Sequence, residues 1–265
     1  MFTISNISSM RRLLIFCFII SGLTTSAQLP SVGSGVYHWK DLNNDAHVRI
    51  QKNILEGSTN ELEYLKIYTR TINPGDTSIQ RFYFRPDVEE LIIIKEGKMT
   101  VGTGLNAYTL NAGSVLLVPP KFPCYVSRAG KDTLAYYVME YRSKKPMDMQ
   151  RAYSTGGLSI VDADTITVIP SPKGDRLNYF DRGTAMCEKM EMHVTNLTNK
   201  GQSHKPHQHI DTEIILMITG ETEMTIDGIH YTAGPGDLYI IESGKMHGVG
   251  NAADKPCSYF AFKWR

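Results

Sequence analysis

The sequence predicts an all-β protein built from two tandem domains of the sandwich or barrel type. Short apolar segments alternate with turn residues at intervals of roughly eight to twelve residues, which is the usual spacing in such folds. The sequence also repeats itself once, at a single long offset, and contains no pattern typical of a long amphipathic helix. At 265 residues and 42% hydrophobic content, the chain is long enough for two small domains with substantial cores.

The internal repeat defines the domain organisation. An offset of 123 residues places Glu90 on Glu213 and Gly97 on Gly220, and the register continues without a gap to the end of each half. Self-similarity at so long a period indicates a duplicated domain and not a solenoid. The expected division is an N-terminal domain, a linker rich in Lys, Pro, Ser and Gly, and a C-terminal domain, at residues 28–142, 143–157 and 158–265.

Within each half, turn-forming residues separate the expected strands. Asp227-Gly228 and Gly234-Pro235-Gly236 are typical of such turns. The clearest strands are expected at residues 91–94, 114–118, 136–141, 189–194, 213–218 and 259–264.

The first 27 residues have the pattern of a signal peptide. Arg11-Arg12 precedes an apolar run at 13–23, and the small residues Thr25-Ser26-Ala27 precede an expected cleavage before Gln28. The apolar run is too short to span a bilayer. We therefore expect an exported protein, periplasmic or secreted, with no membrane attachment after cleavage. The formal charge of +1 gives no reason to expect a nucleic-acid partner.

Cleavage would leave Cys124, Cys187 and Cys257, which permit one disulfide. None of them has CxxC spacing, so we expect small core residues and not redox chemistry.

The C-terminal half contains a segment with typical metal ligands. In residues 201–220, GQSHKPHQHIDTEIILMITG, His207 and His209 are two positions apart and point to the same face of an extended strand. Glu213 follows at an even separation, so a continuing strand or a short turn returns it to that face. Two imidazoles and a carboxylate on one face suit a borderline divalent metal.

A fourth ligand is available downstream. In residues 236–251, GDLYIIESGKMHGVGN, a strand at 238–241 leads through a Ser243-Gly244 turn to His247. His207, His209, Glu213 and His247 therefore form the expected metal site.

The two segments together resemble the two motifs of the cupin superfamily. The first motif, G(X)5HXH(X)3,4E(X)6G, fits from Gly201 to Gly220, and the second, G(X)5PXG(X)2H(X)3N, fits from Gly236 to Asn251 with Glu242 at the proline position. The resemblance implies two double-sheet jelly-roll barrels. It also implies one divalent transition metal, with Mn or Fe favoured and Zn or Ni possible.

The N-terminal barrel keeps most of the glycines of these motifs but has lost the ligands. The positions of the three histidines are taken by Phe84, Pro86 and Cys124, and only Glu90 remains. We therefore expect one metal per chain and a first barrel that is structural, a substrate lid or half of an interface.

Two carboxylates are candidate catalytic groups. Glu213 could remain a metal ligand or move a proton, and Glu242 could be a general base at the mouth of the barrel or a solvated turn residue. His204 is expected to be exposed or beside the ligands. Lys205 and Lys245 flank the ligands and could bind an anionic group, although exposed lysines need no such role.

The expected function is that of an exported metal-dependent enzyme acting on a small polar metabolite, such as a carboxylate, a ureide or a sugar derivative. The chemistry would be that of a hydrolase, isomerase or dioxygenase. An export signal, a first barrel without metal ligands and a second barrel with a metal site form an arrangement similar to that of ureidoglycine aminohydrolases. The alternative is a non-catalytic, metal-bridged module that binds a sugar or another small molecule. Retention of four ligands favours the enzyme. Homo-oligomers are compatible with either function.

Overall fold

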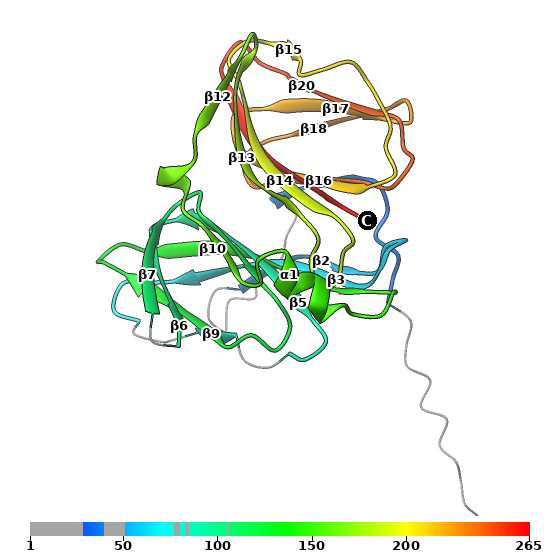
Figure 1. The fold of residues 1–265 in the computed structure, drawn as a ribbon. Coiled ribbons are helices and arrows are strands. Elements are labelled where there is room, and N and C mark those ends of the chain that lie inside the picture. Colours follow the sequence, from blue (N-terminus) through cyan, green and yellow to red (C-terminus); the bar gives the residue numbers. More distant parts are fainter. Residues whose placement is uncertain (1–28, 40–50, 77–79, 83–84, 105) are drawn as a thin grey trace, which may run out of the picture.

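The computed structural model describes residues 29–39, 51–76, 80–82, 85–104 and 106–265, and these are almost entirely β. The first barrel contains a six-stranded and a four-stranded sheet (Figure 1). Its strands are β2 (Gln51–Gly57), β3 (Leu62–Ile72), β4 (Gln80–Phe82), β5 (Glu89–Glu96), β6 (Lys98–Thr103), β7 (Asn106–Asn111), β8 (Val115–Val118), β9 (Cys124–Ala129), β10 (Leu134–Ser143) and β11 (Ser159–Val161).

The second barrel contains a seven-stranded and a four-stranded sheet. Its strands are β1 (Gly35–Tyr37), β12 (Val168–Ser171), β13 (Gly174–Arg182), β14 (Met190–Leu197), β15 (Gly201–Gln202), β16 (Thr212–Thr219), β17 (Thr222–Ile226), β18 (Ile229–Ala233), β19 (Leu238–Ile241), β20 (His247–Asn251) and β21 (Cys257–Trp264). A short helix, α1 (Met149–Ser154), and a 3-10 turn at Ala163–Thr165 lie between the barrels in sequence.

The sheet orders confirm the all-β, two-barrel prediction. The four-stranded sheets run β4-β9-β6-β7 and β15-β20-β17-β18, and the large sheets run β11-β8-β5-β10-β3-β2 and β1-β19-β16-β21-β14-β13-β12. Strands β5 to β10 correspond one by one to β16 to β21 at the offset of the internal repeat. Gly97 and Gly220 occupy the same turn at φ +78° and +70°, and a Cβ at either one would collide with a backbone carbonyl oxygen.

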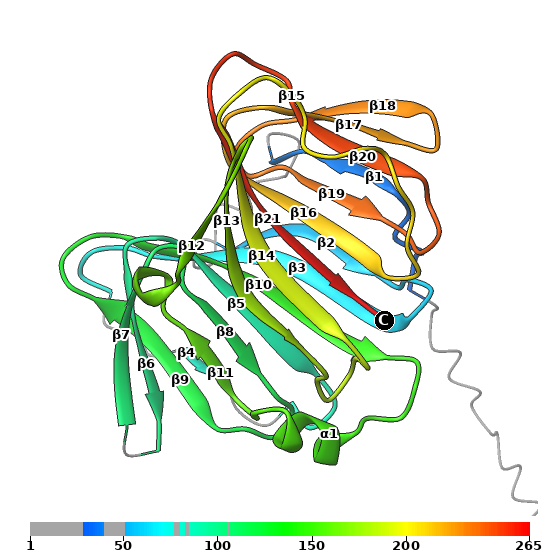
Figure 2. The same ribbon diagram turned by 45° about the horizontal axis from the view of Figure 1, so that its top comes forward.

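The barrels exchange their edge strands. β1 comes from the N-terminal end of the described chain but pairs with β19 of the second barrel, from Gly35 opposite Ile240 to Tyr37 opposite Leu238. β11 follows the linker but pairs with β8 of the first barrel. Figure 2 shows β1 beside β19 and β11 beside β8. The expected division into residues 28–142 and 158–265 therefore differs from the spatial barrels by one strand in each direction.

The two large sheets pack against each other and form the main core. On β16, Ile214 and Leu216 face the first barrel, and the alternate residues Ile215 and Met217 face the interior of the second. β5 alternates in the same way, with Leu91 and Ile93 in the core between the sheets. Because both faces of each large sheet are covered, these strands are continuous apolar runs.

A buried carboxylate joins the barrels next to this core. Glu89, at the start of β5, is 1% exposed. It accepts hydrogen bonds from Thr184 Oγ1 at 2.6 Å and from the backbone N–H groups of Ala185 and Met186, each at 3.1 Å. The segment that leads into β14 is thereby fixed to the first barrel.

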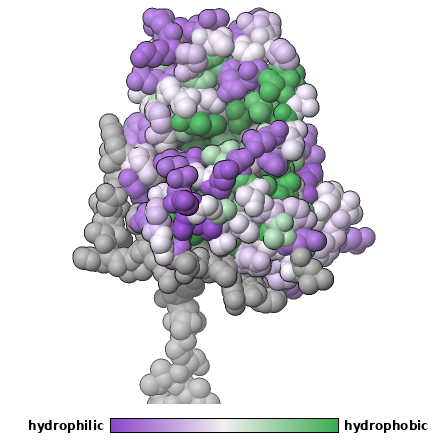
Figure 3. Space-filling view, turned by 90° about the vertical axis from the view of Figure 1, so that its left-hand side faces the viewer, coloured by the Kyte–Doolittle hydropathy of each residue, from purple (hydrophilic) through white to green (hydrophobic). Residues whose placement is uncertain are grey.

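The outer edge of the seven-stranded sheet is exposed. All four residues of β12 are exposed, including Val168 and Ile169. Figure 3 shows the side of the molecule where β7 and β12 lie, and apolar surface there adjoins hydrophilic surface. No helix in the described ranges is both long and apolar enough to cross a bilayer.

The expectations for the signal peptide, for Phe84 and for the three cysteines have different outcomes. The signal peptide at residues 1–27 and Phe84 lie outside the described residues. Cys124, Cys187 and Cys257 are buried and unbridged, so within the described chain they are small core residues.

Candidate metal centre and adjoining cavity

The structure brings His207, His209, Glu213 and His247 together at one end of the second barrel. His247 begins β20 and Glu213 is the second residue of β16. His207 and His209 belong to the loop that precedes β16, so the continuous strand expected through them is absent. Pro206 has no N–H group to extend a ladder, and the pairing is limited to one bridge between His207 and His247.

Backbone hydrogen bonds hold this loop against β20 and its preceding turn. The N–H of His207 donates to the carbonyl oxygen of His247 at 2.9 Å, and the reverse bond measures 2.8 Å. Gly244 N–H donates to the His209 carbonyl oxygen at 2.8 Å. The histidines are therefore positioned by backbone pairing between two segments far apart in sequence.

The imidazole hydrogen bonds direct Nε2 of two histidines into the site. Nδ1 of His209 lies 2.8 Å from the carbonyl oxygen of Asp211, and Nδ1 of His247 lies 2.9 Å from that of Lys245. A carbonyl oxygen only accepts, so each Nδ1 donates to it, and Nε2 is the ring nitrogen that points into the site. Nε2 of His247 is buried and has no hydrogen-bond partner.

Glu213 completes the group. Its Oε2 lies 3.0 Å from His209 Nε2 and 3.2 Å from His247 Nε2. Nitrogen atoms of His207, His209 and His247 lie within 4.8 Å of one another, and this is the one such group of three found in the described residues. Three imidazoles and one carboxylate gathered in this way fit a divalent transition metal.

The electrostatics of the group match a metal-binding role. Burial raises the pKa of Glu213, but the hydrogen bond from His209 and the adjacent imidazoles outweigh burial and hold that pKa well below its usual range. Burial and the neighbouring His247 lower the pKa of His207 to about 4. A deprotonated carboxylate and neutral imidazoles are the forms that bind metal.

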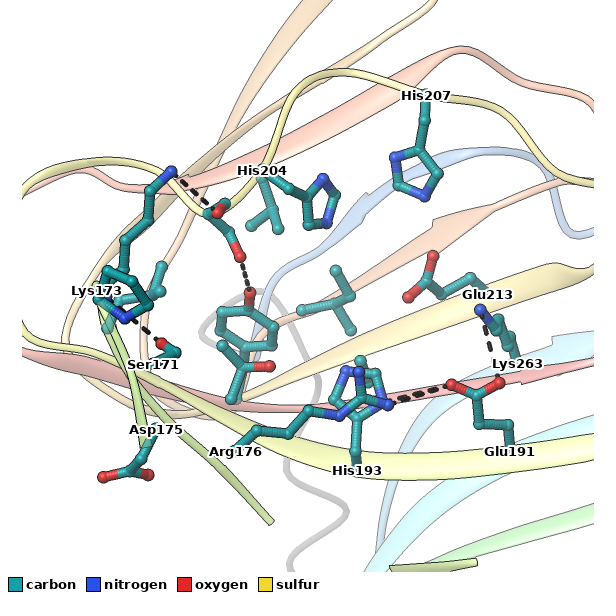
Figure 4. A pocket seen from close by; sticks show the side chains of 18 residues that line it. Ser171, Lys173, Asp175, Arg176, Glu191, His193, His204, His207, Glu213 and Lys263 are labelled. Atoms are coloured by element: carbon teal, nitrogen blue, oxygen red, sulfur yellow. Dashed lines mark hydrogen bonds and ion pairs between the residues drawn. The ribbon is translucent and has the colours of Figure 1, made fainter. Parts of the chain in front are cut away.

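A cavity of about 480 Å³ opens beside this group inside the second barrel. His207 and Glu213 line it, and Figure 4 shows both side chains at one end. A metal held by these residues would therefore face a space large enough for a small molecule.

The sheet that carries Glu213 also presents to the cavity four charged or polar side chains that the sequence analysis missed. We call Arg176, Glu191, His193 and Lys263 the polar wall; they come from β13, β14 and β21. Strand register explains their grouping, because Glu191 lies opposite Lys263, which lies opposite Glu213. Paired residues across an antiparallel sheet share one face.

The sequence contained a signal for part of this wall. In β14, Met190, Met192 and Val194 are buried between the large sheets, and the alternate residues Glu191 and His193 face the cavity. Polar residues at alternate positions of a strand whose other face is core indicate a polar barrel interior.

Glu242 is placed differently from the metal ligands. Its Oε2 accepts hydrogen bonds from the backbone N–H of Ser34 at 3.1 Å and from Ser34 Oγ at 3.0 Å. It is not among the residues that line the cavity. The contact joins the end of β19 to the segment entering β1, which is a structural position.

The remaining sequence candidates surround the site. His204 lines the cavity, and its ring lies edge-on to that of His207 with the centroids 4.6 Å apart. Lys245 pairs with Asp227 at 2.9 Å, and Lys205 is exposed.

The equivalent place in the first barrel holds a different polar cluster. Glu90 and Glu140 lie opposite each other on β5 and β10. Glu140 accepts hydrogen bonds from the hydroxyls of Tyr64 and Tyr68 and pairs with Arg85. Cys124 is buried at the position of His247. Protein cations and hydroxyls thus surround the carboxylates where the second barrel has imidazoles.

Comparisons with known proteins agree with this geometry. Residues 196–263 match the family model described as Cupin domain. Comparison with curated protein sequences gives no match.

Solved structures with similar folds include three bacterial proteins. The protein Ylba from E. coli is 16% identical, with a TM-score of 0.63 over 91% of this chain and 95% of that chain. The oxalate decarboxylase of Lactobacillus farciminis in a formate complex is 10% identical, with a TM-score of 0.65 over 88% of this chain and 87% of that chain. The oxalate decarboxylase OxdC of Bacillus subtilis, described with Mn(II) centres, is 13% identical, with a TM-score of 0.61 over 89% of this chain and 78% of that chain.

The fold and the site define a two-barrel protein whose described residues contain one candidate centre for a divalent metal. Residues 196–263 of the second barrel are similar to a cupin domain, and the chain has a two-barrel, bicupin-like fold.

Proposed function

We propose that this protein is a metal-dependent enzyme that acts on a small polar metabolite in the cavity of the second barrel. The observation that supports the proposal is the position of the expected ligands: His207 belongs to the histidine group, Glu213 contacts His209 and His247, and both His207 and Glu213 line the cavity. A substrate in the cavity could therefore reach the metal directly.

The residues present would hold the metal through His207, His209, Glu213 and His247. When bound, the metal supplies Lewis-acid chemistry to an oxygen of the substrate. The polar wall orients the substrate from the sheet face that also carries Glu213, and it offers His193 as a group that can accept a proton. Burial lowers the pKa of His193 to about 4, with further lowering by Arg176, so this imidazole is neutral at neutral pH.

The finer features of the proposal rest on the ligand set, the comparisons and the sequence. Manganese or iron is favoured, with zinc or nickel possible, because imidazole and carboxylate ligands suit all four and a similar fold is described with Mn(II) centres. Export to the periplasm or beyond follows from the signal-peptide pattern of residues 1–27. Homo-oligomerisation stays a prediction.

Elemental analysis of the purified protein tests the proposal. We expect close to one transition metal per chain in the wild type and loss of that metal in His247→Ala. His204→Ala is the matched control, because His204 lines the cavity outside the ligand group, and it should keep the metal. Equal metal content in all three proteins, or none in the wild type after incubation with Mn, Fe, Zn and Ni, would contradict the proposal.

A second measurement separates the enzyme from the binding module. The metal-loaded wild type is incubated with panels of carboxylates, ureides and sugar derivatives, and both turnover and binding are followed. Metal-dependent binding with no turnover of any bound compound would favour the non-catalytic alternative.

A further inference from the structure

We infer that the polar wall, through Arg176, binds a carboxylate of the substrate at a place separate from the metal. The substrate would then be a small carboxylic acid with a separate group that reaches the metal. This inference rests on the proposed function, because it assigns the other end of the substrate to a metal held by the histidines and Glu213.

The charges of the wall favour an anion. Glu191 is the shared partner of three cations, with distances of 3.3 Å to Arg176 Nη2, 3.3 Å to Lys189 Nζ and 3.6 Å to Lys263 Nζ. Lys189 also pairs with Asp181 at 3.3 Å. Glu191 therefore cannot neutralise both Arg176 and Lys263, and positive charge remains on the cavity side.

Other charges along the cavity do not reverse this balance. Lys173 and Asp175 also line the cavity and offset each other, and in Figure 4 they lie away from Glu213. The negative charge of Glu213 would be neutralised by the metal. A metal-loaded cavity thus has a net attraction for an anionic ligand.

Arg176 has the geometry of a carboxylate-binding residue. Its Nε donates to Asn178 Oδ1 at 2.6 Å and its Nη2 to Glu191 Oε1 at 3.3 Å. These bonds fix the plane of the guanidinium, and Nη1 has no partner among the described residues. A fixed guanidinium with free N–H groups is well suited to a carboxylate.

Figure 4 shows Arg176 and His193 on the opposite side of the cavity from His204 and His207. A bound molecule could therefore contact Arg176 at one end and the metal at the other, with Lys263, the cross-strand partner of Glu213, on the same face of the sheet. The volume of about 480 Å³ corresponds to roughly 16 water molecules at about 30 Å³ each, so the ligand is a small metabolite.

Three hydroxamates test the inference, because they share one metal-binding group. Acetohydroxamate has that group alone, succinic monohydroxamate adds a terminal carboxylate, and its monoamide replaces the carboxylate with an amide. Affinities are measured by calorimetry on the metal-loaded protein. We expect the carboxylate to bind about tenfold or more tightly than the amide, as for hydrogen bonds to a charged group.

Substitutions in the wall identify the source of that preference. The double variant Arg176→Gln/Lys263→Met should reduce the preference for carboxylate over amide to within about twofold. Arg142→Gln, on β10 of the first barrel, is the control and should keep it. Metal content is measured for every variant to show that the site is intact.

The outcomes distinguish the two proposals. Equal affinity for carboxylate and amide, or a preference that survives in Arg176→Gln/Lys263→Met, would overturn the carboxylate site alone. Failure of acetohydroxamate to bind the metal-loaded protein would overturn the proposed function and this inference together, because no metal would then face the cavity.

Discussion

The buried carboxylate of Glu90 should make the stability of the protein fall as pH rises toward neutrality. Glu90 is 6% exposed on β5, and its Oε2 has no hydrogen-bond partner. Burial, and then the charge of Glu140 opposite it, raise the pKa of Glu90 to about 7. Glu90→Gln removes the ionisable group and keeps its size.

The magnitude follows from the shift in pKa. A rise from 4.5 to about 7 corresponds to about 3 kcal/mol at about 1.4 kcal/mol per pH unit. Between pH 4.5 and 7 the native state binds more protons than the unfolded state, so the free energy of unfolding decreases with pH. Above pH 7, Glu90 is ionised in the native state, and the full destabilisation from burying its charge lowers the stability of the wild type. Glu90→Gln should therefore be more stable than the wild type by up to about 3 kcal/mol at pH 8, and the difference should disappear near pH 4.5.

Urea unfolding followed by circular dichroism, at pH values from 5 to 8 and with chelator present, measures this difference. Chelator removes the pH dependence of metal binding from the comparison. Glu96→Gln, at the exposed end of the same strand, should change stability by no more than about 0.5 kcal/mol at every pH. The reasoning is refuted if the curves of Glu90→Gln and the wild type run parallel from pH 5 to 8.

Three further results are expected. Glu89→Ala leaves the buried N–H of Ala185 and the Thr184 hydroxyl without an acceptor and removes one of the two acceptors of the Met186 N–H. Urea unfolding should therefore show a loss of about 3 kcal/mol, whereas exposed Glu63→Ala should lose less than about 1 kcal/mol. Calorimetry should show that metal affinity falls as pH decreases, because protons compete with the metal for the imidazoles. The hydrogen bond to Glu213 raises the pKa of His209 and so strengthens this competition. An affinity that is constant from pH 8 to 5.5 would contradict the ligand assignment. Ser34→Ala removes a hydroxyl that is hydrogen-bonded to Glu242. Loss of about 1 kcal/mol of local stability should speed amide hydrogen exchange in β1 about fivefold, with metal content unchanged. An unchanged exchange rate would show that this contact does not secure β1.

The two-barrel fold could be predicted from the sequence because its signal is repeated. Glycines at equivalent turns, such as Gly97 and Gly220, are required by positive φ and by a carbonyl oxygen that excludes a Cβ. The spacing of the ligands in the sequence likewise predicted that His207, His209, Glu213 and His247 lie together. His207 and His209 are positioned by a loop where a strand was expected. The sequence spacing still predicted their proximity correctly, because the bridge between His207 and His247 fixes the loop against β20.

The edge-strand exchange and the polar wall could not be predicted in the same way. β1 has only three residues, and its pairing with β19 joins segments about two hundred positions apart. In β14 the alternation of polar and apolar residues was visible, but both faces of the large sheet are covered. Periodicity alone therefore could not decide which face lined a cavity.

The exchange of β1 and β11 has a consequence for how this chain folds. The sheet of the second barrel is completed by residues 35–37, whose neighbour in the sheet, β19, is synthesised roughly two hundred residues later. Contacts so distant in sequence form slowly, since loop closure precedes any gain from pairing. Until β1 docks, β19 presents an open edge to other chains. The completion of the second barrel therefore depends on the N-terminal segment remaining accessible during folding.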